Sequence, residues 1–352
     1  MKKGPPRFSV RLLNIARQAL SELGVSPHDR VIFIAFDVYT LLVIKKGAFS
    51  EQEISMARQY IAKNRFIPLI IPDDSSHPDN IFERFLYASD SEAKILESEY
   101  PYIVAPPTDD KPFFFEMRKL STLFAGINSG VLPLNVFSGQ TILFGILVII
   151  LFLGAIFILS PLMILKKRNK TELALHNVIY FSSIGLGFMF VEIVLTQKLV
   201  LYLGHPSYSL SIALFSILLF SGLGSYFSEK PFLKKRYILF ILLAFILLTI
   251  LLMSPILSLT LGSAFILRVF ITLLLLAPLA FLMGTAFPAA AREVSENELP
   301  FLWGINGFFS VVASVSSIII SINFGFTAVF YLSFFCYLAA ASIMAFKFKN
   351  IS

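Results

Sequence analysis

The chain has 352 residues, of which 57% are hydrophobic and only 14% are charged, and its mean hydropathy is +0.79. Soluble domains carry about 25% charged residues, so this composition excludes an ordinary soluble protein and indicates a membrane protein. The formal net charge of +7 comes from Lys and Arg clustered in short loops, which indicates membrane topology rather than a nucleic-acid partner. The single cysteine, Cys336, excludes a disulfide framework.

Residues 1–137 resemble soluble sequence in composition, and nearly all of the long apolar runs follow them. Short β-branched segments alternate with segments of helical apolar spacing, which predicts a small α/β domain. Ser50 and Glu53 form a capping box at the start of one helix, and Pro68 places its strand at a sheet edge or a bulge. We expect helices at 11–20, 50–63, 80–87 and 91–100, and strands at 31–35, 40–44 and 66–71, the first two forming a hairpin.

A charged and aromatic loop, Pro106-Pro-Thr-Asp-Asp-Lys-Pro-Phe-Phe-Phe115, follows these elements. Taken alone, its Thr-Asp-Asp sequence predicts a turn, because Asp side chains bond the local backbone. The sequence has no Gly-x-Gly-x-x-Gly pattern of the kind that holds a nucleotide at a helix N-terminus. It also suggests no Ser-His-Asp or Cys-His arrangement.

Residues 138–352 contain the runs of about 20 apolar residues that a helix needs to span a bilayer, and we expect a transmembrane helical bundle. Small residues, among them Gly185, Gly187, Ser221, Gly222 and Gly224, are expected to let helix backbones approach closely. The expected spans are 140–165, 178–203, 208–227, 237–259, 264–290, 302–323 and 326–346.

The loop charges predict an orientation. The loops after the first, third, fifth and seventh spans carry Lys or Arg, and the intervening loops near 204–208, 254–263 and 322–327 carry none. We expect the protein in the plasma or inner membrane. The positive-inside rule then places the charged loops and the C-terminus on the cytoplasmic side. With seven spans, the same rule puts the soluble domain outside the cytoplasm. The residues concerned are Lys166, Lys167, Arg168, Lys170, Lys230, Lys234, Lys235, Arg236, Arg292, Lys347 and Lys349.

An intramembrane polar cluster is expected near the uncharged loops. Its members lie in or beside spans that are otherwise apolar: Glu192, Gln197, Lys198, His205 and Arg268. Charge at bilayer depth is costly, so such groups pair with one another, face the protein interior or line a pathway. Three interpretations stay open for Glu192: a structural ion pair with Arg268 or Lys198, a functional site, or a lipid-headgroup contact.

The remaining polar residues give weaker signals. His205 stands in a Gly-His-Pro turn without a second His or Cys nearby, so we expect a loop residue and no metal site. Near the opposite loops, Trp303, Asn306 and Arg292 indicate an interfacial anchor and a helix-packing amide rather than a site.

Five segments together carry a family resemblance. The chain resembles the bacterial polytopic membrane proteins with a spermidine-synthase-like domain, in which a Rossmann-type aminopropyltransferase- or methyltransferase-like domain precedes a membrane block. The resemblance covers nearly the whole chain and makes Asp109 and Asp110 candidate catalytic residues. The segments are Pro-Pro-Thr-Asp-Asp-Lys-Pro-Phe-Phe-Phe (106–115), Gly-Phe-Met-Phe-Val-Glu-Ile (187–193), Leu-Gly-His-Pro-Ser-Tyr-Ser-Leu (203–210), Phe-Ser-Gly-Leu-Gly-Ser (220–225) and Trp-Gly-Ile-Asn-Gly (303–307).

The soluble domain departs from that family. Its start resembles the middle of the family's domain, so the half that would bind S-adenosylmethionine or its decarboxylated form is absent, and we expect no cofactor in this chain. The expected fold is thus an incomplete Rossmann-type domain followed by about seven transmembrane helices. That cofactor would enter only if a partner chain supplied the missing half, completing an exposed strand edge such as 31–35.

Three functions stay open. The chain is the membrane half of a split spermidine-synthase-like transferase, inactive alone, or a non-catalytic membrane protein with a remnant docking domain, or a transporter of small cationic metabolites that uses Glu192, Lys198 and Arg268. Against transport, the sequence shows no internal repeat between its halves. The loop charges conflict with the first function, because a nucleotide-using domain is expected in the cytoplasm.

Overall fold

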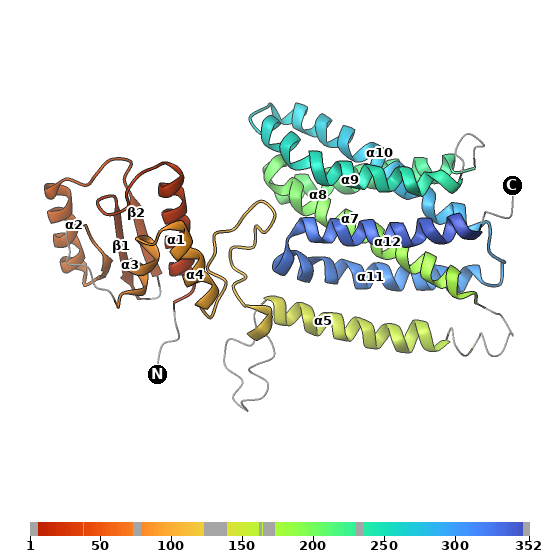
Figure 1. The fold of residues 1–352 in the computed structure, drawn as a ribbon, viewed down its shortest axis with the longest axis horizontal. Helices are drawn as coiled ribbons and strands as arrows, with labels where there is room; N and C mark the ends of the chain where they lie inside the picture. Colours follow the sequence, from red (N-terminus) through yellow and green to blue (C-terminus); the bar gives the residue numbers. More distant parts are fainter. Residues whose placement is uncertain are drawn as a thin grey trace. The chain divides into compact units, whose positions relative to one another are not determined.

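The computed structural model describes residues 6–37, 39–72, 79–122, 139–161, 164, 173–229 and 235–347. They divide into two compact units. The first, the α/β unit, comprises Met1–Thr108 and Pro112–Ser138, and the second, the helical unit, comprises Asp109–Lys111 and Gly139–Ser352. Asp109–Lys111 therefore belong to the helical unit, although both flanks of their loop belong to the other. Figure 1 labels most of the helices and strands of both units.

The α/β unit contains a three-stranded antiparallel sheet in the order β2-β1-β3. The strands are β1 (Val31–Phe36), β2 (Tyr39–Ile44) and β3 (Ile67–Ile70), and the helices are α1 (Phe8–Glu22), α2 (Glu51–Asn64), α3 (Ile81–Leu86) and α4 (Asp90–Glu99). The predicted hairpin of β1 and β2 is confirmed, with Val31 opposite Ile44 and Phe36 opposite Tyr39. The predicted capping box is also present, because Ser50 and Glu53 bond each other's backbone N–H groups.

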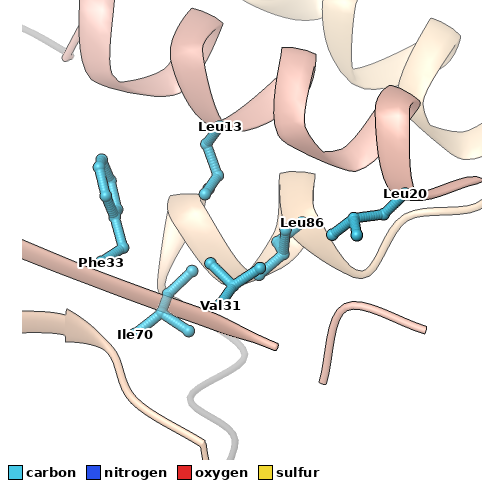
Figure 2. Packing of buried hydrophobic residues seen from close by; sticks show 6 residues of the cluster. All are labelled: Leu13, Leu20, Val31, Phe33, Ile70 and Leu86. Carbon is cyan, nitrogen blue, oxygen red and sulfur yellow. The ribbon is translucent and has the colours of Figure 1, made fainter. Parts of the chain in front are cut away.

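The two faces of the sheet bury separate apolar clusters, as the alternation of side chains along a strand requires. On one face, Val31 and Phe33 of β1 pack with residues of α1, β3 and α3, as Figure 2 shows. On the other face, Ile32 and Ile34 pack with Ile54 and Ile61 of α2. The first cluster consists of Leu13, Leu20, Val31, Phe33, Ile70 and Leu86.

Strand order corrects one expectation and confirms another. The prediction that 31–35 is an exposed edge was wrong, because β1 pairs with a strand on each side and the edges are β2 and β3. β3 contains Pro68, lies at an edge and shows a register shift opposite Phe33 and Ile34, as the missing N–H of proline predicts. The parallel strands of a Rossmann-type sheet are not seen in the described strands, so that part of the fold stays a prediction.

Within its described residues, the helical unit contains seven helices that are long and apolar enough to cross a membrane, and the chain is a multi-pass membrane protein. They match the seven expected spans to within a few residues, except that residues 162, 163 and 165 of the first span lie outside the described residues. Their membrane-spanning parts are Gly139–Ile158, Leu175–Leu203, Pro206–Phe227, Tyr237–Thr260, Phe265–Ala291, Leu299–Phe324 and Phe326–Phe346.

These spans belong to helices that pack around α7 (Leu175–Leu203), the most buried of them. α7 packs closely on α8 (Pro206–Phe227), α11 (Leu299–Phe324) and α12 (Phe326–Lys347). α9 (Lys235–Thr260) and α10 (Phe265–Ala291) complete this group, whereas α5 (Gly139–Gly154), which continues into the π-helical turn η2 (Ala155–Leu159), lies beside α11 at its margin (Figure 1).

Small residues let α8 and α10 touch backbone to backbone. A Cβ atom added to Gly224 of α8 would lie 1.9 Å from the carbonyl oxygen of Phe281, and one added to Gly284 of α10 would lie 2.0 Å from that of Ser221. Gly185 likewise lies against the backbone of Asn306 on α11, and Gly187 lies against the ring of Tyr337 on α12, so the packing role predicted for these glycines is confirmed. Gly222 has no atom within 4 Å of such a Cβ, and packing does not account for it.

Most of the loop charges behind the orientation lie outside the described residues: Lys166, Lys167, Arg168, Lys170, Lys230, Lys234 and Lys349. The domain boundary near 137 also lies there. At the same end of the helical unit, Arg292 is described, and its guanidinium donates to Ser228 and pairs with Glu229 at 3.1 Å.

Candidate functional site: the uncharged end of the helical unit

The predicted site residues, except Glu192, lie towards the end of the helical unit that carries the loops without Lys or Arg. We call it the uncharged end. Three connections lie there: Gly204–His205 between α7 and α8, residues 261–264 between α9 and α10, and Gly325 between α11 and α12. Asp109–Lys111 also contact this end, through α11 and α12.

Asp110 caps the N-terminus of α12. Its carboxylate oxygen Oδ1 accepts hydrogen bonds from the backbone N–H of Thr327 at 2.9 Å and from the Thr327 hydroxyl at 2.7 Å. Its backbone carbonyl accepts a further bond from the N–H of Phe326 at 2.9 Å. The first N–H groups of a helix lack partners within the helix, and the positive end of the helix dipole attracts a carboxylate, so Asp110 satisfies both requirements.

Lys111 makes the complementary contact at the neighbouring helix end. Its ammonium donates to the backbone carbonyl of Asn323 at the C-terminus of α11, at 2.9 Å. A cation is favourable at that negative end of the helix dipole. Adjacent residues of opposite charge therefore bind adjacent helix ends of opposite polarity.

Gly325 makes this close contact possible. Its φ of +93° is a conformation that residues with a Cβ rarely adopt, and an added Cβ would lie 2.0 Å from Oδ2 of Asp110. A side chain at this position would therefore both strain the turn between α11 and α12 and push Asp110 away from the end of α12.

Lys198 and Asp109 are the charged groups of this end that do not cap a helix. Lys198 lies on α7, and its ammonium donates to the hydroxyl of Ser254 on α9 at 2.9 Å. It also lies within electrostatic range of Asp109 and Asp110. The side chain of Asp109 is exposed and makes no hydrogen bond or ion pair within the described residues. Lys198 and Asp109 thus offer a cation and a free anion to a polar ligand.

His205 and Arg268 have structural contacts instead. The Nδ1 atom of His205 accepts a hydrogen bond from the backbone N–H of Ser207 and so caps α8, which agrees with its interpretation as a loop residue. Arg268 donates to the carbonyl oxygen of Tyr202 in the last turn of α7, at 2.6 Å. The hydroxyl of Tyr202 in turn bonds that of Thr260 at 2.8 Å.

Glu192 lies apart from these groups. The end of α7 and the start of α10 both lie at the uncharged end. Glu192 precedes the end of α7 by 11 residues, and Arg268 follows the start of α10 by three. At 1.5 Å per residue, Glu192 is therefore roughly 12 Å deeper in the helical unit than Arg268. Neither an ion pair with Arg268 nor one with Lys198 is present among the described side chains. Gln197 is exposed on α7.

Arg11 of α1 organises the two flanks of the Asp109–Lys111 loop within the α/β unit. Its guanidinium donates to the carbonyl oxygens of Ala105, Phe113, Phe114 and Glu116 at 2.7–3.2 Å. Burial lowers the pKa of Arg11, but the group stays charged because a guanidinium does not lose its proton in proteins. The buried guanidinium of Arg11 thus holds the two flanks of this loop together by hydrogen bonds to their backbone carbonyl oxygens.

Sequence reasoning missed the partners of Asp110. Gly325, Phe326 and Thr327 follow a long apolar run with no loop between, and a Gly followed by an aromatic residue and a Thr is a weak signal for a helix boundary. Ser254, the partner of Lys198, carries no signal at all. No group of three or more His, Cys, Asp or Glu side chains suited to a metal ion occurs within the described ranges.

Comparisons with known proteins add no relative. No protein-family model matches the chain, and no curated protein or solved structure matches it either. The resemblance to spermidine-synthase-like membrane proteins, and with it the catalytic role of Asp109 and Asp110, therefore stays a prediction.

Proposed function

We propose that this chain is the membrane-embedded half of a spermidine-synthase-like protein, completed by a partner chain that supplies a nucleotide-binding α/β half. The observation that carries the proposal is an uncovered apolar surface along β2. On the assembled protein we propose an aminopropyltransferase- or methyltransferase-like activity, which this chain alone lacks.

The uncovered surface is clearest in two cross-strand pairs. Leu41 lies opposite Ile34, and Val43 lies opposite Ile32, so the members of each pair share one face of the sheet. Ile34 and Ile32 are 4% and 6% exposed beneath α2, whereas Leu41 and Val43 are 45% and 40% exposed. α2 thus covers β1 and leaves β2 bare.

An edge strand of this kind is a template for another chain. β2 is six residues long, lies at the edge of the sheet and contains neither Lys nor Pro, the residues that commonly protect an edge. Exposed apolar residues on an edge strand mark an interaction surface. A further strand and its helix from an α/β partner would cover both the bare backbone and the bare side chains.

The residues present do not fit S-adenosylmethionine by themselves. Nucleotide sites of this fold class need a glycine-rich turn between a strand and a helix. Here β1 leads into a hairpin, and the connection from β2 to α2 carries Gly47 alone. The proposed partner would therefore bring the entire nucleotide site, and no step of the chemistry is assigned to this chain.

The proposal leaves two opposite orientations of the chain in the membrane to be tested. The charged loops indicate that the uncharged end, with Asp109 and Lys198, lies on the side opposite the cytoplasm. A cytoplasmic nucleotide supply requires the reverse, and long domains are weak determinants of topology. A protease-protection assay on the α/β unit in sealed inside-out vesicles decides between the two orientations.

The test measures nucleotide binding with and without the partner. The purified chain in nanodiscs is titrated calorimetrically with S-adenosylmethionine and with its decarboxylated form, and so is the complex isolated from native membranes through a tag on this chain. We expect binding by the complex only. Leu41→Asp should lose partner and nucleotide together, and Met56→Lys, an exposed residue of α2, should keep both. Binding by the chain alone would refute the proposal.

A non-catalytic membrane protein with a docking domain is the second candidate. It is favoured by the capping contacts of Asp110 and Lys111, which give the Thr-Asp-Asp-Lys loop a structural role. A partner that binds at β2 but takes up neither nucleotide would support it. Transport gains no such support, because Arg268 is bonded to Tyr202 and Lys198 to Ser254, and neither reaches Glu192.

A further inference from the structure

Two exposed aromatic rings lie together on the α/β unit. Phe115 is 79% exposed, and Phe8, the first residue of α1, is 49% exposed, although both side chains are large and apolar. Their ring centroids are 5.8 Å apart, so two segments that are distant in the sequence form one apolar patch. We call it the Phe8–Phe115 patch. Contiguous exposed apolar side chains of this kind mark a surface that binds a protein or a membrane.

The backbone that presents Phe115 is held in place from within the α/β unit. The N–H of Glu116 donates to the carbonyl oxygen of Phe113 at 3.3 Å, which closes a tight turn with Phe115 at its tip. The guanidinium of Arg11 donates to the carbonyl oxygens of Phe113, Phe114 and Glu116 at 2.7–3.2 Å. Hydrogen bonds to three residues of this turn therefore fix the position from which the Phe115 ring points outward.

The chain tethers Phe115 close to the membrane surface. The carbonyl oxygen of Asp110 accepts a hydrogen bond at 2.9 Å from the N–H of Phe326, the first residue of α12. α12 has 22 residues and is therefore about 33 Å long, slightly longer than the hydrocarbon core of about 30 Å, so that its first residue reaches the headgroup layer. Phe115 follows Asp110 by five residues, which extend over at most about 18 Å. The patch is thus within reach of the headgroups.

Cations flank the patch in both segments. Arg7 directly precedes Phe8, and Arg118 and Lys119 follow Phe115 within four residues, with one acidic residue between them. Apolar and aromatic side chains bordered by Lys and Arg are typical of protein surfaces that lie in the membrane interface. There the rings enter the boundary between headgroups and acyl chains, and the cations attract anionic headgroups.

We propose that the Phe8–Phe115 patch inserts into the headgroup layer of the bilayer and holds the α/β unit on the membrane surface. The tether to α12 and the flanking cations favour a lipid surface over a soluble protein as the occupant of the patch. The proposal does not depend on a partner chain at β2, because that strand belongs to a different part of the α/β unit.

Quenching by brominated lipids tests the insertion in the full chain. Trp303→Phe removes the single Trp, and Phe115→Trp then introduces one fluorophore into the patch. The chain is placed in nanodiscs of phosphatidylcholine and phosphatidylglycerol, with or without bromine atoms on the acyl chains close to the headgroup. We expect a blue-shifted emission and a loss of intensity in the brominated lipid, because bromine quenches a Trp side chain that it contacts.

Tyr60→Trp in the same Trp303→Phe chain is the control. Tyr60 is 59% exposed on α2, and α2 packs on the face of the sheet opposite to α1. We expect little quenching there. Equal intensity of the Phe115→Trp chain in both lipids would overturn the proposal, and so would a blue shift without quenching, which would show that a protein segment covers the patch. A loss as large in the control would overturn it too.

A charge placed in the patch separates insertion from folding. Phe8→Asp puts a carboxylate at the first residue of α1, whose first turn has no acidic residue and whose dipole favours one. Hydrogen-exchange protection of α1 should therefore stay equal or rise. Bromine quenching of the Phe115→Trp chain should decrease, because anionic headgroups repel the carboxylate. Met56→Asp, which adds the same charge on α2, should leave quenching unchanged. Undiminished quenching in Phe8→Asp would contradict a shared patch.

Discussion

The two units of this protein differ in whether their exposed helix ends and strand edges find partners within the chain. In the helical unit, the exposed helix ends of the uncharged end find partners: Asp110 binds the start of α12, Lys111 the end of α11, and Arg268 the end of α7. In the α/β unit, Leu41 and Val43 of β2 are 45% and 40% exposed, and no helix of the described residues covers them as α2 covers β1. The difference teaches that helix ends at the uncharged end are satisfied within the helical unit, whereas β2 keeps an exposed apolar face to which the proposed partner chain would bind.

The largest effect is expected where α8 and α10 touch backbone to backbone. Gly224→Ala places a Cβ against the backbone of Phe281, where nothing flexible can yield. We expect a loss of about 3–4 kcal/mol in the free energy of unfolding. Overpacking typically costs about 1–3 kcal/mol and occasionally more, and here the added Cβ would lie 1.9 Å from a backbone oxygen. Gly222→Ala on the same helix meets open space and serves as the matched control. Thermal unfolding followed by Trp303 fluorescence measures both, and equal melting temperatures would contradict the close crossing of α8 and α10.

The pair Ile34 and Leu41 compares the covered and the uncovered part of the sheet. Ile34→Ala removes a side chain buried beneath α2 and should cost about 2–4 kcal/mol. Leu41→Ala, on the same face but exposed, should change stability by less than about 1 kcal/mol. Hydrogen exchange of β1 peptides in the full chain measures the local stability. Equal losses would mean that β2 is already covered.

The capping contact of Asp110 gives an effect of intermediate size. Asp110→Ala removes the acceptor of Thr327 and the charge at the start of α12, and should cost about 1–2 kcal/mol. Asp109→Ala, at an exposed neighbour without a bonded partner, should be neutral for stability. Hydrogen exchange at the first turn of α12 and the melting temperature report the difference. Destabilisation by Asp109→Ala alone would reverse the roles assigned to the two carboxylates.

The smallest effect concerns acid sensitivity in the α/β unit. Hydrogen bonds from Lys45 and from the backbone of Ser50 lower the pKa of Glu53 from 4.5 to about 2. A carboxylate with a lowered folded-state pKa stabilises the fold above pH 4.5, and this contribution disappears as the pH falls to about 2. The protection of α2 peptides from hydrogen exchange, relative to the intrinsic exchange rate at each pH, should therefore fall over that interval. Glu53→Gln should lack this part of the pH dependence, and an unchanged profile would contradict the cap.

The sequence predicted what depends on local pattern. Apolar run lengths placed the seven spans, and Ser50 with Glu53 predicted the start of α2, because both signals lie within a few neighbouring residues. It did not predict contacts between distant segments. Asp110 and Thr327 are 217 positions apart, and the central place of β1 depends on its pairing with β3 after an intervening helix.

In the candidate site, too, the sequence did not predict which distant residues each side chain contacts. The expectation of a polar cluster rested on residue type and approximate depth, and both are local properties. Two of the five groups turned out to bind helix ends: His205 caps α8 and Arg268 binds the last turn of α7. Helix neighbours decide such partners, and apolar periodicity does not encode which helices are neighbours.

The most direct test of an incomplete α/β unit is site-specific photocrosslinking at position 43 in native membranes. A photoreactive amino acid replaces Val43 on β2, or Met56 on α2 as the control, and mass spectrometry identifies the adducts. We predict, at position 43 only, an adduct with a polypeptide that contains a strand, a glycine-rich turn and a helix. No adduct at position 43, or the same adducts at both positions, would contradict the account.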